Sequence, residues 1–271
     1  MKLKKSIEKA KLQRREAIHK LSLEVPKLEK KANGQEWIPP IYSESKSIEL
    51  DFTKLAENRV VSVIPDSPEA EYYKVLRTNI QQRTRENNWN TIMITSVYPD
   101  EGKTLTSINL AITFAKEFNQ TVLLVDCDLR RQQIHKYLNV WFEYGIVDYL
   151  LEDRNLKDLI LWPNIEKLTL ISGGKTIGNS SELLGSPKMK ALVKEIKHRY
   201  ADRCIIFDVP PVLSGADAIT FSQMVDCILM VVEEGRASIK EIKKALEMIP
   251  TEKFLGFVYN RAKSQVHSYY Y

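Results

Sequence analysis

Long hydrophobic runs and cysteines are both scarce in this chain of 271 residues. No stretch of about 18 or more apolar residues occurs, so no segment is expected to span a bilayer. Residues 1–20, MKLKKSIEKAKLQRREAIHK, lack the apolar core of a secretory signal. The three cysteines all lie in apolar, strand-like runs. Their odd number and their setting predict reduced core side chains in a cytosolic protein, and argue against a metal or catalytic role.

What is present is an ordinary globular composition with an uneven charge. Hydrophobic residues make up 44% and charged residues 28%, enough for one large α/β domain with an appendage or for two small domains. Residues 1–31 hold eleven Lys and Arg against four Glu, a net +7, whereas the whole chain carries +5. The other 240 residues therefore sum to −2, and the basic charge belongs to the start of the chain.

Residues 3–28 place apolar side chains at alternating steps of four and three, which predicts a basic amphipathic helix. Its seam consists of Leu3, Ile7, Ala10, Ala17, Leu21 and Leu28. Three interpretations of residues 1–32 remain open: a solvated helix, a helix docked on a partner helix, and a helix lying on an anionic membrane. No aromatic or glycine-rich pattern accompanies the charge, so nucleic acid is not an expected partner. Residues 32–58, with Pro39 and Pro40, are predicted to be a linker.

From residue 60 onward, strand-like and helix-like stretches alternate. Apolar runs of strand length are found at 60–64, 91–95, 121–125, 168–171, 204–207, 226–232 and 254–259. Stretches with helical periodicity separate them, at 69–87, 104–117, 188–200, 216–223 and 238–248. Several strands are apolar on both faces, as in strands covered by helices on each side. We predict an α/β fold with a doubly wound, mostly parallel sheet, whose ligands bind beyond the carboxyl ends of the strands.

One predicted strand leads into TSVYPDEGKT, residues 95–104, whose last three residues are typical of the end of a phosphate-binding loop. The usual preceding glycines are missing, and Val97 stands where the first is expected. A helix is predicted to begin at Thr104, so its N-terminal amides would converge on the loop in a way that suits phosphate. Lys103 is expected to reach the β- and γ-phosphates, and the Thr104 hydroxyl to ligate Mg²⁺.

Carboxylates end two later strands. Asp126 and Asp128 close the run VLLVDCD, and Asp208 closes CIIFD. Side chains two positions apart on a strand point to the same side, so Asp126 and Asp128 are expected to face one place, where they repel unless a cation lies between them. Asp208 has the form of a Walker B carboxylate that holds Mg²⁺ directly or through water. The three motifs together predict a nucleotide site.

The combination S-x-x-P-x-E-G-K-T, V-D-x-D-L-R-R and I-I-F-D-x-P-P resembles the bacterial tyrosine kinases, whose P-loop fold is shared by septum-site and partition ATPases. The resemblance runs from about Glu69 to Tyr271 and includes EYYKVLRTNI at 71–80, NSSELLGSP at 179–187, VYNRA at 258–262 and the terminal SYYY. It implies a kinase domain over 59–262, after an N-terminal helix and linker over 1–58, and before a tyrosine tail over 263–271. It also implies the use of ATP and Mg²⁺.

By the same resemblance, the protein would be a cytoplasmic autokinase at the inner face of the cell membrane. Such kinases regulate the polymerisation and export of capsular and exopolysaccharides. Its partners would be other copies of itself, assembled in a ring with the tail of one subunit in the site of the next. A separate membrane-spanning polysaccharide co-polymerase would be a further partner, since the chain has no membrane-spanning run of its own.

The resemblance further implies roles for individual residues. Asp126 would take the proton of the attacking tyrosine, acting with the other catalytic residues Lys103, Asp128 and Asp208. Mg²⁺ would be organised by Thr104, Asp128 and Asp208. The nucleotide would contact Pro99, Asp100, Glu101, Gly102, Lys103, Thr104 and Leu105 and, at the adenine, Asn260 and Arg261. The phosphoacceptors would be Tyr269, Tyr270 and Tyr271, and the subunit interface would use Glu71, Lys74 and Arg77.

Several positions depart from the family pattern. Lys74 replaces an arginine and so loses the bidentate geometry of a guanidinium. Asp100 stands where glycine is common, and Gln132 where proline usually follows the two arginines. Two interpretations of Arg130 and Arg131 remain open: they bind a phosphate or an acidic tail, or they form structural ion pairs. Asn260 and Arg261 could also simply cap the sheet, and the interface residues could form an ordinary exposed charged stripe.

Two other functions are compatible with the predicted fold. A partition-type or septum-type ATPase carries a signature lysine early in the loop, where this chain has Tyr98, and this difference favours the kinase. A non-catalytic nucleotide sensor would need a damaged site, whereas Lys103, Thr104 and the three aspartates are all present.

Overall fold

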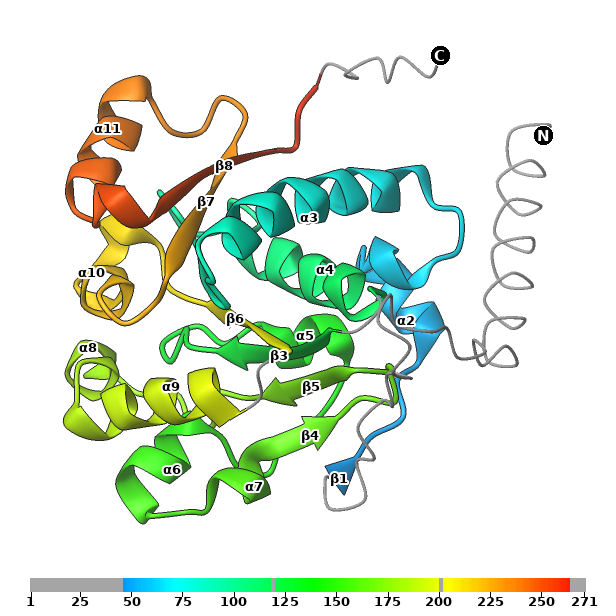
Figure 1. The fold of residues 1–271 in the computed structure, drawn as a ribbon, viewed down its shortest axis with the longest axis vertical. Coiled ribbons are helices and arrows are strands. Elements are labelled where there is room, and N and C mark those ends of the chain that lie inside the picture. The colour runs from blue at the N-terminus through cyan, green and yellow to red at the C-terminus, as the bar shows by residue number, and fades with distance from the viewer. Residues whose placement is uncertain (1–45, 118–119, 200–201, 264–271) are drawn as a thin grey trace.

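The computed structural model describes residues 46–117, 120–199 and 202–263, and its eight strands in these ranges form one sheet (Figure 1). The strand order is β1-β4-β5-β3-β6-β2-β7-β8. The strands are β1 (Lys46–Ser47), β2 (Thr91–Ser96), β3 (Thr121–Asp126), β4 (Ile160–Trp162), β5 (Leu168–Ile171), β6 (Arg203–Asp208), β7 (Cys227–Glu233) and β8 (Phe254–Asn260). Neighbouring strands run parallel except β4 and β5, which are antiparallel. The predicted mostly parallel α/β sheet is confirmed.

Helices cover both faces of the sheet, as the apolar strands predict. One core is formed with α2 (Phe52–Glu57), α3 (Pro68–Glu86), α4 (Lys103–Ala115) and α5 (Ile134–Leu138). The other is formed with α6 (Ile146–Glu152), α7 (Leu156–Leu159), α8 (Ser180–Leu184), α9 (Pro187–Arg199), α10 (Asp217–Ser222) and α11 (Ile239–Glu247). Three short 3₁₀ turns, at Val61–Val63, Val212–Ser214 and Thr251–Lys253, complete the described elements.

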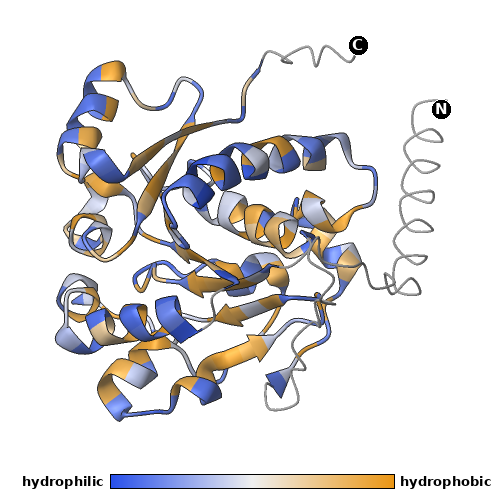
Figure 2. Cartoon of the chain, viewed as in Figure 1, coloured by the Kyte–Doolittle hydropathy of each residue, from blue (hydrophilic) through white to orange (hydrophobic). Residues whose placement is uncertain are grey.

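The central strands divide their side chains between the two cores. On β2, Met93 belongs to one core, whereas Ile92 and Ile94 belong to the other, and all three are essentially fully buried. This division follows from the alternation of side chains along a strand. Figure 2 shows the outcome as central strands that are mostly hydrophobic and helices that are hydrophobic on part of their surface only. The carboxyl ends of β2, β3 and β6 are thereby held side by side.

Local signals explain where α3 and α11 begin. Pro68 opens α3 after Ser67, and the acidic Glu69 and Glu71 lie in its first turn, where the helix dipole favours negative charge. A capping box formed by Ser238 and Glu241 starts α11. The predicted helices at 69–87, 104–117, 188–200, 216–223 and 238–248 correspond to α3, α4, α9, α10 and α11.

The predicted strand at 60–64 is wrong. Val61–Val63 form a 3₁₀ turn, and their polar groups bond to α4 instead of to a neighbouring strand. The Ser62 N–H donates to Asn109 Oδ1 at 2.8 Å, and the Ser62 hydroxyl lies 2.9 Å from that of Thr113. The apolar pattern of this segment therefore reflects packing on a helix.

The predicted linker is also structured in its described part. From residue 46 it forms β1 and α2, and Leu55 of α2 is fully buried. Asp51 caps α2 by accepting from the N–H groups of Thr53 and Lys54. The predicted basic helix and the tyrosine tail lie outside the described residues, so the domain boundaries remain predictions.

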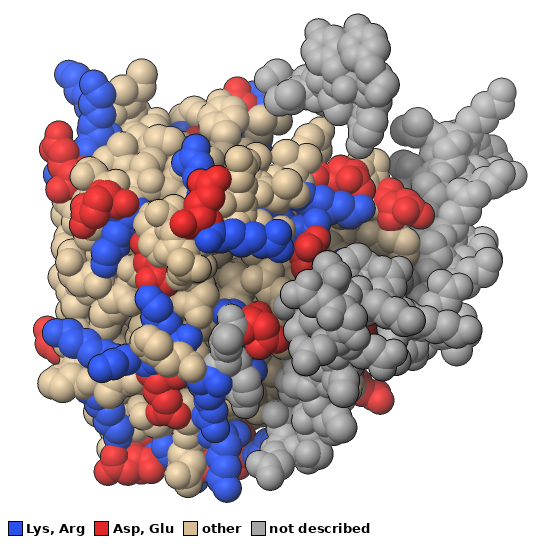
Figure 3. Space-filling view, in the orientation of Figure 1, with Lys and Arg blue, Asp and Glu red and all other residues tan. Residues whose placement is uncertain are grey.

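The described body carries interspersed charges of both signs on the face drawn in Figure 3. This is consistent with the sequence-based view that the basic excess belongs to residues 1–31. None of the helices in the described ranges combines the length and the apolar character needed to cross a bilayer.

Candidate active site

The phosphate loop runs from the carboxyl end of β2 to the first residue of α4. Gly102 occupies the N-cap of α4 with φ of 95°, a conformation that residues with a Cβ adopt at a cost. Because glycine has no side chain with which to cap the helix, the first-turn amides remain available to an anion. A Cβ on residue 102 would also lie 2.1 Å from Nδ2 of Asn260. Glycine is thus required here for two independent reasons.

Glu101 holds the loop from inside the protein. Its side chain is fully buried, and its carboxylate accepts from the N–H of Tyr98 at 2.7 Å and from the N–H of Glu233 at 3.4 Å. Burial raises the pKa of Glu101, and these backbone N–H groups oppose the rise. The side chain is engaged inside the protein, and a nucleotide contact of Glu101 remains a prediction. The sequence showed the missing glycines but gave no sign of this carboxylate support.

Lys103, Asp128 and Asp208 meet just beyond the loop, as predicted. Lys103 Nζ lies 2.8 Å from Asp128 Oδ2 and 3.5 Å from Asp208 Oδ1. The Thr104 hydroxyl donates to Asp208 Oδ2 at 2.6 Å, and the Ser107 hydroxyl donates to Asp208 Oδ1 at 3.3 Å. All of these side chains are buried. One cation and several acceptors therefore share a compact polar cluster at the N-terminus of α4.

Electrostatics couple the members of this cluster. Burial alone would lower the pKa of Lys103, but the carboxylates of Asp208 and Asp128 outweigh it and raise that pKa. Burial raises the pKa of Asp208, and this rise is opposed by Lys103 and by the Thr104 hydroxyl. A buried lysine that stays charged supplies the positive charge that phosphate oxygens need.

Asp126 lies next to this cluster, at the last position of β3. It is the register partner of Asp208 on β6, and it is almost fully buried. Burial, followed by the nearby Asp208 carboxylate, raises its pKa well above the ordinary value. Asp128 lies beyond the end of β3, so strand alternation is not what brings the pair together. Instead, the N–H of Asp128 donates to Asp126 Oδ1 at 3.1 Å in a tight turn.

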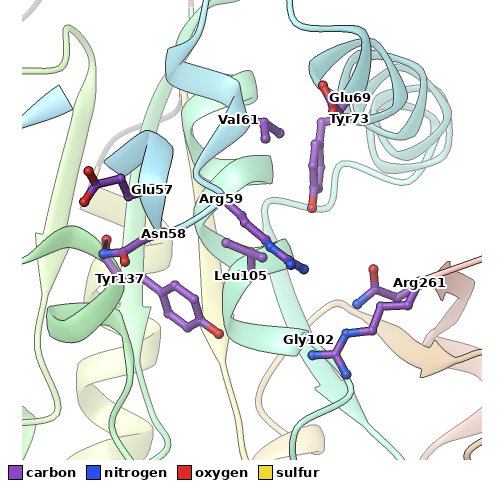
Figure 4. Close-up of a pocket in the computed structure, with 11 residues that line it drawn as sticks. Glu57, Asn58, Arg59, Val61, Glu69, Tyr73, Gly102, Leu105, Tyr137 and Arg261 are labelled. Atoms are coloured by element: carbon purple, nitrogen blue, oxygen red, sulfur yellow. Dashed lines mark hydrogen bonds between the residues drawn. The ribbon is translucent and has the colours of Figure 1, made fainter. Parts of the chain in front are cut away.

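A cavity of about 500 Å³ opens beside the loop (Figure 4). Four residues predicted to contact the nucleotide line it: Gly102, Leu105, Asn260 and Arg261. Other lining residues come from elements that the sequence did not connect with the site, among them Arg59 after α2, Tyr73 of α3 and Tyr137 of α5. The sequence predicts a linker and a strand on either side of Arg59, and no motif marks this position.

Asp100 and the residues that follow Asp128 form contacts of their own outside the lysine–aspartate cluster. Asp100 is exposed and pairs with exposed Arg131 at 3.6 Å. Arg130 donates from Nε to the Ser180 hydroxyl at 2.6 Å and pairs with Asp217 at 3.3 Å. Arg130 and Arg131 could bind a phosphate or an acidic tail, or form structural ion pairs. The structure shows an ion pair for both. Gln132 is buried against Gly173, and its Nε2 has no hydrogen-bond partner among the described residues.

The predicted interface residues lie on α3. Glu71 and Lys74 form an ion pair with each other and are about half exposed. Arg77 is only 16% exposed in its side chain, and its guanidinium pairs with Glu117 at 2.7 Å and donates to the carbonyl oxygen of Thr113 at 3.0 Å. Arg77 is therefore engaged within its own chain, and an interface role for the three residues remains a prediction.

The donor set fits Mg²⁺ better than a transition metal. No group of three or more His, Cys, Asp or Glu side chains in the described ranges is arranged to hold a metal ion. The cluster offers the Thr104 hydroxyl and two carboxylates, and Mg²⁺ is usually bound through one or two carboxylates, waters and substrate phosphates. Thr104, Asp128 and Asp208 would be the protein ligands.

Together the loop, the helix N-terminus and the strand-end carboxylates define a P-loop nucleotide-binding protein. A family model described as an AAA domain matches residues 90–254, more than half of the chain. Tyrosine-protein kinase YwqD of Bacillus subtilis is 32% identical over 220 residues, which cover 80% of this chain and 92% of YwqD.

Two solved structures share the fold at similar identity. The chimerical protein CapA2B2 is 31% identical with a TM-score of 0.70, over 83% of this chain and 96% of that one. The kinase domain of the Escherichia coli tyrosine kinase ETK is 31% identical with a TM-score of 0.67, over 76% of this chain and 82% of that one. The chain belongs to the bacterial tyrosine-protein kinase family. The predicted kinase is confirmed over the partition-type ATPase.

Proposed function

We propose that this kinase transfers the γ-phosphoryl group of ATP to Tyr269, Tyr270 and Tyr271 of a neighbouring copy of the chain. The observation that carries the proposal is the buried cluster of Lys103 with Asp128 and Asp208 at the N-terminus of α4, with Asp126 directly beside it. A fixed positive charge, helix amides and a carboxylate that accepts the phenol proton would together support phosphoryl transfer.

The residues divide the chemistry among themselves. Lys103 and the loop amides would hold the phosphate oxygens and spread their charge during transfer. Asp126 would accept the phenol proton as the tyrosine oxygen bonds to the γ-phosphorus and the bond to the β-phosphate oxygen breaks, releasing ADP. When bound, Mg²⁺ would supply further positive charge to the phosphate oxygens. In the structure Lys103 pairs with Asp128, so nucleotide binding would draw the lysine toward the phosphates and leave Asp128 to the metal.

An exposed face of α3 supports assembly into an oligomer. Tyr72 and Val75 on α3 are 56% and 61% exposed, next to the Glu71–Lys74 pair. A helix face with exposed apolar groups and charges is typical of a contact surface between subunits. Mixing two variants distinguishes transfer between chains from transfer within one chain.

The cellular role that we propose is control of capsule or exopolysaccharide synthesis, at the membrane and with a separate membrane-spanning partner. The family membership and the +7 charge of residues 1–31 support it. Deletion of residues 1–32 should move the protein from the membrane fraction to the supernatant. An unchanged distribution would contradict a role of this segment in docking.

The direct test of the activity is incubation of the purified chain with ATP labelled at the γ-phosphate. Label on tyrosine is the expected result, and it should disappear in Lys103→Met. Free labelled phosphate without labelled protein would instead indicate an ATPase. Neither product would indicate a nucleotide-sensing scaffold.

A further inference from the structure

The cavity beside the phosphate loop contains an arginine that the proposed chemistry does not yet use. Arg59 and Arg261 extend into it from opposite walls (Figure 4). Arg261 pairs with Glu233 at 2.8 Å, a carboxylate that also pairs with Arg236 at 3.3 Å, and Glu57 at the edge of the cavity is paired with Lys54 at 3.1 Å. Within the described ranges, the Arg59 guanidinium forms no ion pair. The guanidinium shares the cavity with the carboxylates of Glu57 and Glu69, and its exposed position makes it suited to contact a ligand there.

The backbone that carries Arg59 is firmly held. Asn58 donates from Nδ2 to the carbonyl oxygens of Tyr137 at 2.9 Å and Lys136 at 3.2 Å. Asn109 of α4 donates to the carbonyl oxygen of Arg59 itself at 3.2 Å. Arg59 has φ of 64°, a left-handed conformation that is costly for a residue with a Cβ. Such strain persists where the surroundings enforce it, and it is common where residues contact ligands.

The place of the cavity indicates which ligand Arg59 would meet. Gly102 and Leu105, at and just after the N-cap of α4, form one side of it. A nucleotide whose phosphates lie on the loop would therefore extend its nucleoside end into this space. A volume of about 500 Å³ is within the usual range for small-molecule sites. The hydroxyl ends of Tyr73 and Tyr137 face the same space, so its lining combines aromatic and polar groups (Figure 4).

We propose that Arg59 is a further nucleotide-binding residue, which holds the nucleoside end of ATP through the plane of its guanidinium. A guanidinium can stack on a purine ring and donate hydrogen bonds at the same time, whereas a lysine ammonium cannot stack. The inference rests on the proposed use of ATP at this loop. If it holds, the nucleotide site includes a segment that lies before the family match at residues 90–254.

The test is an equilibrium titration of the full chain with ADP, in which calorimetry measures the dissociation constant. Arg59→Gln should raise the dissociation constant about tenfold, or 1.4 kcal/mol. Arg59→Lys should recover only a minor part of this loss, because the planar group is missing. The control is Arg85→Gln, which removes an exposed arginine from the far end of α3 and should leave the constant unchanged.

The outcomes separate this inference from the proposed function. Unfolding temperatures measured without ligand should be equal for wild type and both Arg59 variants, since neither substitution changes the backbone constraint. If wild type binds ADP and forms phosphotyrosine while Arg59→Gln binds ADP within twofold of wild type, the inference is overturned and the function stands. Recovery of full affinity by Arg59→Lys would also overturn it, because charge alone would then explain the contact. A wild-type chain that does not bind ADP would overturn both.

Discussion

Asn260 donates from its side-chain amide to the carbonyl oxygen of Glu101 at 2.7 Å, which ties the end of β8 to the phosphate loop. The same amide nitrogen lies 2.1 Å from the place that a Cβ on residue 102 would take. Because the chain continues from β8 toward the tyrosine tail, the loop that is to hold ATP and the segment that leads to the phosphoacceptors share a direct contact.

Gly102→Ala should therefore weaken nucleotide binding by at least roughly tenfold, since the new methyl group meets Asn260 and the left-handed conformation adds about 1 kcal/mol. Titration with ADP measures the effect. An affinity of Gly102→Ala equal to that of wild type would show that the loop does not need this geometry.

Glu101→Gln should destabilise the fold although it keeps the shape of the side chain. The glutamine amide group would face a backbone N–H where the carboxylate oxygen now accepts, leaving a buried donor unpaired at a cost of about 1–3 kcal/mol. Thermal unfolding should shift down by about 2–4 °C per kcal/mol. Glu252→Gln, at an exposed position, is the control. Equal unfolding temperatures for both variants would contradict a supporting role for Glu101.

Asp226 provides a pH-dependent stability that is separate from the site. It joins the starts of β2 and β7, accepting from the N–H groups of Asn90 and Thr91 at 3.0 and 3.1 Å, and it pairs with Lys197 of α9. Although burial opposes them, Lys197, Asn90 and Thr91 lower its pKa below the ordinary 3.8. Its contribution is therefore present above the unfolded-state pKa and is lost as the pH falls through the lower, folded-state value.

Asp226→Asn should accordingly lower the free energy of unfolding by about 1–3 kcal/mol at pH 7, and the difference from wild type should shrink below pH 4. Denaturant unfolding at several pH values measures it, with the exposed Asp202→Asn as control. A difference that is constant from pH 7 to pH 3 would mean that the carboxylate charge plays no part.

Phosphorylation of the tail should loosen the proposed assembly. Each phosphate adds about −1.5 to −2 charges, so three modified tyrosines add about −5, next to a site that already contains three aspartates. The phosphomimetic variant with Tyr269, Tyr270 and Tyr271 changed to Glu should have a lower apparent mass in light scattering than the triple Phe variant. A Glu variant that assembles as tightly as wild type would contradict the proposed release.

The sequence predicted those parts of the molecule in which local chemistry and tertiary packing agree. The long helices, the fully apolar strands and the meeting of Lys103 with Asp128 and Asp208 follow from periodicity and from the common edge of parallel strands. Short elements such as α2 and α5 contain too few residues for a periodic signal. Val61–Val63 carries the apolar pattern of a strand but packs on α4. Only the tertiary structure decides whether such a segment joins the sheet or packs on a helix.

Site residues were predictable where a motif requires particular residue types. They were not predictable where tertiary packing brings a residue to the site. The sequence predicts a nucleotide contact for Glu101 but gives no sign that its side chain supports the loop from the interior. Arg59 carried no signal at all, because its place beside Leu105 depends on how the chain between α2 and α3 packs on α4 and α5. Arg77, expected at an interface, is engaged by Glu117, and no local pattern indicates such a partner 40 residues away.

The central claim is that the cluster of Lys103 and Asp126 phosphorylates a tyrosine supplied by another copy of the chain. Two variants test it when mixed with labelled ATP: Lys103→Met, which retains the tail but lacks the phosphate-binding lysine, and the triple Tyr269, Tyr270 and Tyr271 to Phe variant, which retains the site but lacks the tail. We predict that neither is labelled alone, that Lys103→Met becomes labelled on tyrosine in the mixture, and that adding Asp126→Asn to the Phe variant abolishes this. An unlabelled Lys103→Met chain in the mixture, with wild type labelled in parallel, would contradict the account.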